Sequence, residues 1–339
     1  MDLIYIRNRD GEYDSGYLRN YVADFDISSD IENSTNDFTL EMPLPDSQEG
    51  LYFAENEIST IIFIEGTEYG GEILGSVIDI AANQITYTGR TWRGTLEQYI
   101  IEPPAGEDYL VVSGNVADCI EQFPLPADME VAPNAYTSGS FQVDRYITTL
   151  KGITKLLANV DTSLRIRVTY EQDDGAYTGT VTMQVIPARD LTSLIEASQD
   201  YSDRIQLKLT RDHNTPHHII CLGQGELHER EVIHLYADED WNVTQTEIPG
   251  AYPVETYDYS SSENLISDGL KHYAEVIANH EQIEVTISDL EVMLGDIISA
   301  KDNLTGETVT AEIVNIIYHI VDNGTYATES YQYKTKVRL

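Results

Sequence analysis

The sequence predicts an α+β protein that is mostly β and is divided into several small domains. Most of the chain alternates apolar and polar residues over short stretches, which is typical of half-buried strands. One example runs from Tyr21 to Ile27, where every second residue is apolar. Helical spacing of apolar residues is confined to a short run at 116–123 and to three longer ones, at 91–101, 148–160 and 262–278. The 339 residues can form two or three cores, since one domain typically has ~100–200.

The first 88 residues are predicted to be almost entirely strands. Glycine pairs and prolines separate the apolar runs, and Asp10-Gly11 is a hairpin signal. The predicted strands are Leu3–Ile6, Tyr21–Ile27, Phe38–Met42, Ser59–Glu65, Glu72–Ile80 and Ile85–Thr88.

The next stretch, from Gly89 to Pro104, is predicted to close this β region with a short amphipathic helix. Gly89 is expected to break the preceding strand, and Thr91 is expected to cap the helix. Prolines 103 and 104 cannot continue a helix and should end it. The predicted apolar face consists of Trp92, Leu96, Tyr99 and Ile100.

Residues 105–190 are predicted to hold two helices followed by a β-hairpin. The first helix ends before Pro124 and Pro126, and the polar stretch 127–144 is predicted to be a loop. Strands at 164–170 and 181–185 alternate strictly and are joined by a turn at Asp174-Gly175. The apolar positions of the helices are Val116, Cys119, Ile120 and Phe123 in the first, and Leu150, Ile153, Leu157 and Val160 in the second.

The last 150 residues return to β structure around one further helix. An exposed acidic loop is predicted from Asp238 to Tyr259. Ser260 and Glu263 match a capping box, and Asn323-Gly324 matches a hairpin turn. The predicted strands are 205–209, 217–222, 231–236, 283–287, 294–299, 309–321 and 331–339. The apolar stripe of the helix consists of Ile266, Leu270, Tyr273 and Ile277, and the basic face of the last strand consists of Lys334, Lys336 and Arg338.

Composition excludes several classes of partner. Twenty Lys and Arg against 58 Asp and Glu give a formal net charge of -38, which repels a phosphate backbone and an anionic membrane surface. We therefore expect no nucleic-acid binding and no membrane insertion, and no signal peptide or apolar run of 18 residues is visible. The 41% hydrophobic residues and 23 tyrosines indicate a folded chain. Cys119 and Cys221 are expected to be buried free thiols.

No catalytic, cofactor-binding or metal site is predicted. Phosphate loops, a Gly-x-Ser-x-Gly elbow and a His-Glu-x-x-His motif are all missing. Pro216 forbids a helix that would align the histidines around it, so they are interpreted as ordinary turn residues rather than zinc ligands. The candidate metal ligands are His213, His217, His218, His228 and Glu229. With 58 acidic residues, no carboxylate pair stands out for glycoside cleavage.

An aromatic group in the acidic loop is the remaining candidate site. Tyrosine is enriched in protein contacts, so an interface or packing role is favoured, and sugar binding is the alternative. The group consists of Trp241, Tyr252, Tyr257 and Tyr259.

Three short motifs, taken in order, resemble the hub proteins of siphophage and prophage tails. These tail-tip or Tal-like proteins are similar to the baseplate hub of contractile tails. The motifs are the strand ending in Gly89-Arg90 with its helix and Ile100-Ile-Glu-Pro-Pro104, Pro187-Ala-Arg-Asp-Leu191 after a strand, and Leu294-Gly-Asp-Ile-Ile298.

The resemblance implies two tube-like β domains and a lateral α/β domain. Residues 1–104 would form a tube-like domain with its closing helix, and 105–190 the lateral domain. Residues 191–259 would return to complete the tube-like domains, and 260–339 would add a helix and a barrel-like tube domain. It also implies a homotrimer that joins the tail tube to the tip and lines the DNA exit channel. Its partners would be distal tail or tube proteins and the tape measure protein, in a virion tail assembled in the bacterial host cytoplasm.

Two alternatives remain open at this point. One is a tail-associated cell-wall hydrolase, although the lytic domain of long family members is not expected in a chain that ends in a strand at Leu339. The other is a module that binds a carbohydrate receptor through the aromatic loop.

Overall fold

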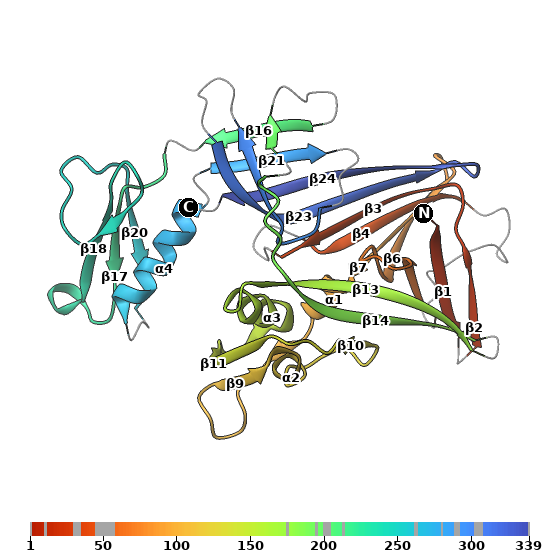
Figure 1. Ribbon diagram of the computed structural model, residues 1–339, viewed down its shortest axis with the longest axis horizontal. Coiled ribbons are helices and arrows are strands. Elements are labelled where there is room, and N and C mark those ends of the chain that lie inside the picture. Colours follow the sequence, from red (N-terminus) through yellow and green to blue (C-terminus); the bar gives the residue numbers. More distant parts are fainter. Residues whose placement is uncertain are drawn as a thin grey trace.

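The structure is a computed structural model, and it confirms a mostly β fold built from several sheets (Figure 1). It describes residues 2–337 except 10–11, 30–34, 45–57, 174–175, 194–195, 199–204, 212–213, 261–263, 279–280, 288–291 and 302–307. The predicted turns at Asp10-Gly11 and Asp174-Gly175 fall outside these residues. Within the described part of the chain, no helix combines the length and apolarity needed to cross a membrane.

A single 13-stranded sheet runs through the molecule and combines both ends of the chain. Neighbouring strands along its main path are antiparallel, and β22 (Ile297–Lys301) joins from the side, pairing with β23 and in parallel with β15 (Glu196–Ser198). The strands of the main path, in spatial order, are β16 (Ile205–Arg211), β21 (Glu281–Ile287), β24 (Ala327–Val337), β23 (Thr308–Asp322), β3 (Tyr21–Ser28), β4 (Asp37–Pro43), β7 (Gln84–Thr91), β6 (Gly70–Asp79), β5 (Ile58–Ile64), β1 (Leu3–Arg9) and β2 (Glu12–Tyr17).

An aromatic row crosses the seam between β3 and β23, where the N-terminal strands meet the C-terminal ones. Phe38, Phe25, Tyr318 and Tyr331 lie directly opposite one another on four adjacent strands. Their successive ring centroids are 5.5, 6.4 and 4.9 Å apart. Tyr69, from the turn between β5 and β6, stacks on Tyr318 at 4.2 Å. Cross-strand aromatic pairs of this kind stabilise a sheet beyond their buried area, so the row fastens the two halves together.

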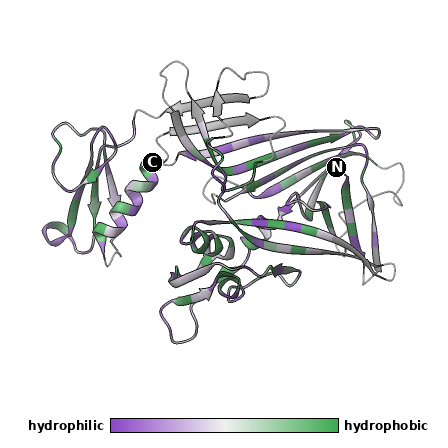
Figure 2. Cartoon of the chain, in the orientation of Figure 1, coloured by the Kyte–Doolittle hydropathy of each residue, from purple (hydrophilic) through white to green (hydrophobic). Residues whose placement is uncertain are grey.

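The alternation predicted from the sequence decides which face of the large sheet is buried. Tyr21, Ala23 and Phe25 on β3 are at most 2% exposed, and the residues between them are half-buried. Figure 2 shows the same alternation of hydrophobic and hydrophilic residues along the strands of this sheet. The buried face therefore points toward the lateral part of the chain, and the other face is polar.

The lateral part packs two helices and three small sheets around one core. Its hairpin of long strands is confirmed and is covered on one edge by β10, which pairs with β14 in parallel. The predicted loop at 127–144 is wrong, because β10 and β11 lie within it; each is too short or too polar to show a strand pattern. The elements are β9 (Leu110–Asn115), α2 (Val116–Ile120), β10 (Met129–Val131), β11 (Thr137–Val143), α3 (Thr149–Ala158), β13 (Thr162–Asp173) and β14 (Ala176–Pro187).

The helix predicted at 91–101 is shorter than expected. It spans only Trp92–Leu96 (α1), because Ile100–Ile101 leave it as β8 and pair with β12 (Ile147–Thr148). Trp92 and Leu96 are buried, but Ile100 is 43% exposed and does not belong to their face. Gly89 does not break the strand either: it lies inside β7, close to the backbone of the neighbouring strand.

A separate four-stranded sheet carries the longest helix, α4 (Leu265–Ala278), on one side (Figure 1). The apolar stripe is confirmed at Tyr273 and Ile277, which are buried, but it is wrong in the first half of the helix. There Ile266 and Leu270 are each 42% exposed, and Leu265 is buried instead. The predicted loop 238–259 also contains two strands. The elements of this sheet are β17 (His218–Leu222), β18 (Val232–Ala237), β19 (Val243–Thr244) and β20 (Val254–Asp258), with a 3-10 turn at Leu227–Glu229.

Candidate functional site at the junction of the sheet and the lateral domain

The three motifs that stand far apart in the sequence come together where the large sheet meets β13. Two arginines, each in an ion pair with a carboxylate, connect the segments that meet here. We call this region the junction. The pairs are Arg93 with Glu68 and Arg189 with Asp296.

Arg93 is the buried centre of the junction. Its side chain is 1% exposed, and its guanidinium forms an ion pair with Glu68 from the β5–β6 turn. Its Nη2 also donates to the backbone oxygen of Leu164 on β13 at 2.6 Å, and Glu68 accepts a bond from the amide of Ile166 at 3.4 Å. A buried charge is tolerated only when it is paired and hydrogen-bonded, so α1, the β5–β6 turn and β13 are held in one arrangement.

Arg189 and Asp296 join the second and third motifs. Asp296 is 2% exposed and accepts bonds from Arg189 Nε at 2.8 Å and from the backbone amide of Met293 at 2.7 Å. The backbone amides of Leu191 and Ile297 complete the contact, the first donating to Ile297 at 2.8 Å and the second to Arg189 at 2.9 Å. The chain leaving the lateral hairpin is therefore fixed against the start of β22.

Gly295, in the third motif, is a position of this arrangement where the backbone conformation and the space available require glycine. Its φ is +86°, and a Cβ there would lie 2.0 Å from the hydroxyl oxygen of Ser163. The predicted strand at 294–299 therefore begins only at Ile297, after a turn that only glycine fits.

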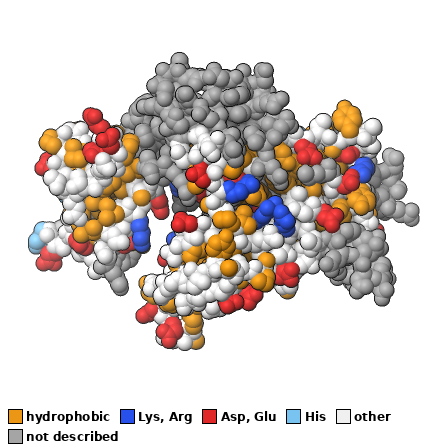
Figure 3. Space-filling view, in the orientation of Figure 1, with side chains coloured by type: hydrophobic (Ala, Val, Ile, Leu, Met, Phe, Trp, Pro, Cys, Tyr) orange, Lys and Arg blue, Asp and Glu red, His pale blue; other side chains and the backbone are white. Residues whose placement is uncertain are grey.

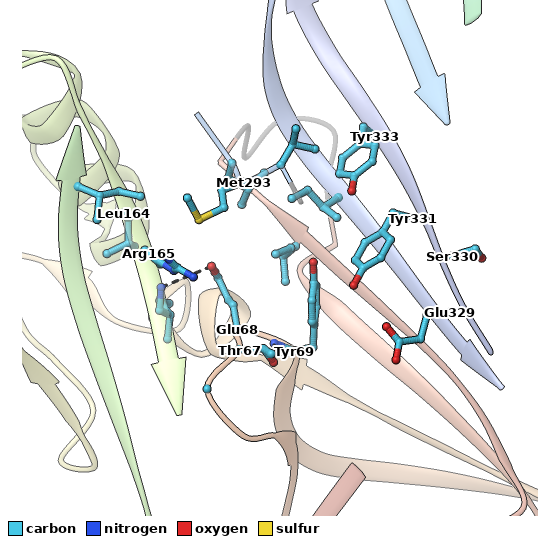
Figure 4. Close-up of a pocket in the computed structure, with 17 residues that line it drawn as sticks. Thr67, Glu68, Tyr69, Leu164, Arg165, Met293, Glu329, Ser330, Tyr331 and Tyr333 are labelled. Atoms are coloured by element: carbon cyan, nitrogen blue, oxygen red, sulfur yellow. Dashed lines mark hydrogen bonds between the residues drawn. The ribbon is translucent and has the colours of Figure 1, made fainter. Parts of the chain in front are cut away.

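A cavity of about 420 Å³ opens beside the junction, between the buried face of the large sheet and β13. Figure 4 shows Glu68 and Arg165 on one side of it, with Tyr331, Tyr333 and Glu329 on the side formed by β24. We call it the tyrosine cavity. Apolar side chains of the sheet and of the segment before β22 form the remainder of its lining: Ile27, Ile316, Val292 and Leu294 among them.

The structure does not bring the candidate metal ligands together. His217 stacks on Trp241 at 4.3 Å, while His218 Nε2 lies 2.9 Å from Nδ1 of His234. Burial, and secondarily His234, lowers the pKa of His218. His228 is exposed and its Nε2 lies 4.0 Å from Glu229 Oε1, and His213 lies outside the described residues. Among the described residues, no group of three His, Cys, Asp or Glu could hold a metal ion.

The predicted aromatic group is divided between core and surface. Tyr257 stacks on His272 at 3.9 Å and lies 5.7 Å from Tyr259. Burial, followed by the neighbouring Tyr259, raises the pKa of Tyr257. Trp241 packs against the core under α4, whereas Tyr252 is 74% exposed. The group therefore does not form one aromatic surface.

The basic face of the last strand lies inside the sheet rather than along its edge. The register places Lys334 opposite Glu284 on β21 and Lys336 opposite both Gln282 on β21 and Glu312 on β23. Arg338 is outside the described residues. Few Lys and Arg side chains are visible among the acidic ones in Figure 3, in keeping with the composition.

Sequence reasoning missed the junction and the cavity. The one usable signal was an arginine between the buried positions Trp92 and Leu96 of a very short helix. The partner carboxylates Glu68 and Asp296 carried no signal, because they are two of 58 acidic residues.

Comparison with solved structures identifies the class of fold. The chain is 12% identical to the prophage MuSo2 43 kDa tail protein from Shewanella oneidensis, with a TM-score of 0.58, covering 100% of this chain and 98% of that one. It is 14% identical to the tail protein from Neisseria meningitidis MC58, with a TM-score of 0.55, covering 99% and 97%. No family model matches the sequence, and no match was found among curated proteins. The chain thus has the fold of phage tail proteins along its whole length, as the motif resemblance predicted.

Proposed function

We propose that this chain is a structural subunit of a phage or prophage tail, located in the tip hub that joins the tail tube to the tip. The observation that carries the proposal is the fold shared with two tail proteins over at least 97% of all three chains. Fold alone does not determine function, but a match that covers nearly the whole of each chain favours the same structural role.

The proposed hub is a ring of three copies. In this proposal residues 1–104 and 191–339 supply two tube-like domains, and residues 105–190 form the lateral domain. The 13-stranded sheet supports this division into domains. At its β3–β23 seam, a strand from residues 1–104 and a strand from residues 191–339 lie side by side in one curved surface. Two such domains in each of three copies would give a pseudo-six-fold ring, and closed cyclic symmetry is the usual outcome for identical subunits.

The polar face of the large sheet is the proposed lining of the DNA exit channel. Asp24 and Asp26 on β3 and Glu41 on β4 lie on this face, opposite the buried core positions. His319 on β23 also contacts this group, and its Nδ1 lies 2.7 Å from Asp24 Oδ1. An acidic face repels the phosphate backbone, so DNA would pass without binding.

The proposed partners are distal tail or tube proteins and the tape measure protein, and the proposed location is the virion tail, assembled in the host cytoplasm. No enzymatic activity is part of the proposal. A hydrolase would need a positioned acid and base, and the junction instead holds its carboxylates in ion pairs with arginine.

Electron microscopy of the purified chain tests the proposal. Rings with three-fold symmetry and an open centre are expected at high protein concentration, and antibodies against the chain should label the tip of assembled tails. Labelling along the whole tail, or at the head, would show that the protein has a different place in the particle. Peptidoglycan zymography separates this role from the hydrolase, which would give clearing.

A further inference from the structure

The four-stranded sheet under α4 has a second face, which also carries apolar side chains. The face that packs on α4 uses alternate residues that are at most 2% exposed: Ile219, Cys221, Leu235 and Ala237. The residues between them point to the other side of the sheet, because side chains alternate along a strand. We call that side the outer face. The lobe formed by this sheet and α4 stands at one end of the molecule (Figure 1).

The strand register arranges the outer face as three rows across β18, β17 and β20. Val232 and Val254 on this face are 46% and 41% exposed, and Ile220 and Leu222 between them are half-buried. Contiguous exposed apolar patches mark interaction surfaces. In order, the rows are Tyr236, His218 and Val254, then His234, Ile220 and Thr256, then Val232, Leu222 and Asp258.

The outer face itself carries little net charge. Its carboxylate, Asp258, forms an ion pair with Arg230. Its two histidines contact each other, with Nε2 of His218 2.9 Å from Nδ1 of His234. Burial lowers the pKa of His218, so this ring is neutral at neutral pH.

Acidic residues lie near both ends of the strands that form the outer face. Glu247 is close enough to His218 to raise its pKa against the effect of burial. Between residues 214 and 260, Arg230 is the sole Lys or Arg in the sequence, and it is already paired. An apolar centre within an acidic rim is complementary to an apolar stripe flanked by Lys and Arg. The exposed carboxylates are Glu226 and Glu229 between β17 and β18, Glu239 and Asp240 after β18, and Glu247 after β19.

Charge and shape select a helix of another protein as the occupant. A second copy of this chain is disfavoured, because two outer faces in contact would bring two acidic rims together. An added strand would pair with an edge of the sheet and would leave its face open. The opposite face of the same sheet is covered by α4, which has 14 residues, so a helix of similar length matches the outer face.

We propose that the outer face binds a basic amphipathic helix of a partner protein. The apolar stripe of that helix covers Ile220, Leu222, Val232 and Val254, and its Lys and Arg side chains reach the carboxylates at the strand ends. The proposal rests on this sheet and its charge and does not depend on a role in phage tails.

A pair of labelled Leu/Lys peptides tests the proposal on the full chain. Both have the length of α4 and the same composition, but the leucines of one lie at helical spacing on one face and those of the other are shuffled. General attraction to an acidic protein acts equally on both. Fluorescence anisotropy at ~0.15 M salt should show the amphipathic peptide binding at least about 10-fold more tightly. Equal affinities, or no binding of either at millimolar concentration, would overturn the proposal.

Variants then locate the peptide. Val232→Lys combined with Val254→Lys should lower the affinity for the amphipathic peptide to that for the shuffled one. Both positions are exposed, so the variant should fold, and thermal unfolding checks this. The matched control, Ile266→Lys with Leu270→Lys, makes the same charge change at exposed positions of α4 and should keep the preference.

Three results would sink the proposal at this stage. The outer-face variant could keep its preference for the amphipathic peptide, or the α4 variant could lose it, and in either case the peptide binds elsewhere. Sedimentation could also show that the parent self-associates and the outer-face variant does not. The outer face would then be covered by a second copy of this chain rather than by a partner helix.

Discussion

Asp296 and Arg189 are 107 residues apart in the sequence, yet Arg189 Nε donates to the Asp296 carboxylate at 2.8 Å. Because Asp296 is 2% exposed and Arg189 is 39% exposed, the pair is reached by water from one side only. This contact ties the end of the lateral hairpin to the strand that feeds the large sheet. The lateral part is therefore attached to the large sheet through this pair as well as through Arg93.

Replacing Asp296 by Asn should cost about 2 kcal/mol of unfolding free energy, because the amide cannot satisfy the guanidinium and the Met293 amide together. Urea unfolding measures the loss. The matched control is Asp144→Asn, which removes an exposed pair with Lys155 and should cost less than about 1 kcal/mol. Equal losses in the two variants would show that the Asp296 pair is no stronger than a surface contact.

Arg93→Met should cost about 3 kcal/mol, because it leaves the Glu68 carboxylate and the Leu164 carbonyl without their donor. Met keeps much of the apolar stem, so packing changes little. The double variant Arg93→Met, Glu68→Gln should lose less than the sum of the single variants, since both remove the same ion pair. Additive losses in a double-mutant cycle would mean that the two side chains act independently.

Gly89→Ala should prevent the large sheet from forming. A Cβ at this position would lie 2.1 Å from the carbonyl oxygen of Glu72 and 2.4 Å from the ring of Phe38, and neither can move without breaking a strand pair. Circular dichroism should show loss of native β structure. Gly139→Ala in β11 is the control, because no heavy atom lies within 4 Å of its added Cβ. A native spectrum for Gly89→Ala would contradict the packing described for β7.

The contrast between Gly89 and Tyr21–Ile27 shows what the sequence could and could not predict. Alternation along β3 was readable because one face of the strand is buried and the other is not. The need for glycine at position 89 could not be predicted from the sequence, because it arises from contacts with Phe38 and Glu72 on two other strands. For the same reason a glycine that permits close strand pairing was interpreted as a strand breaker.

The error in the first half of the α4 stripe, at Ile266 and Leu270, has a different cause. Leu265, Ile266 and Leu270 offer two overlapping apolar stripes, and helical spacing alone cannot choose between them. The sheet that covers the helix makes the choice, burying Leu265 and leaving the other two exposed. At the junction, the motifs containing Arg93, Arg189 and Asp296 were noticed from their order, but their pairing is a property of the folded chain.

Glu97 provides a test by pH. Burial, partly offset by a hydrogen bond from Asn36, raises the pKa of its carboxyl group, so folding disfavours the charged form. Its contribution to stability is fully present below the unfolded value of ~4.3 and is lost as the pH rises through the raised folded value. Glu97→Gln should therefore be more stable than the parent at pH 7, with a difference that shrinks toward pH 4.

Thermal unfolding of this variant at several pH values measures the difference. The Gln side chain can still accept the bond from Asn36. Glu107→Gln, at an exposed position, should show no such trend. A stabilisation that grows as the pH falls would have the wrong sign and would contradict the effect of burial.

Assembly of the chain should depend on salt and pH because of its net charge of -38. Copies repel one another, so the isolated chain should be monomeric or weakly associated at low salt and neutral pH. Raising the salt, or lowering the pH toward the sequence pI of about 4.2, should favour the proposed trimer until solubility fails. Sedimentation across a salt series measures this. A trimer that dissociates as salt rises would show that attraction governs the interface, for example through Lys334, Lys336 or Arg338.

The seam between β3 and β23 has a consequence for synthesis. Asn20 at one end of it donates to Asp322, 302 residues further along the chain. A ribosome that has released β3 must add every element up to β23 before the partner strand exists, and until then one edge of β3 stays open to pairing with other chains. The lateral hairpin and the sheet under α4 can fold from local contacts as they emerge, but the large sheet is completed only after β23 and β24 have been made.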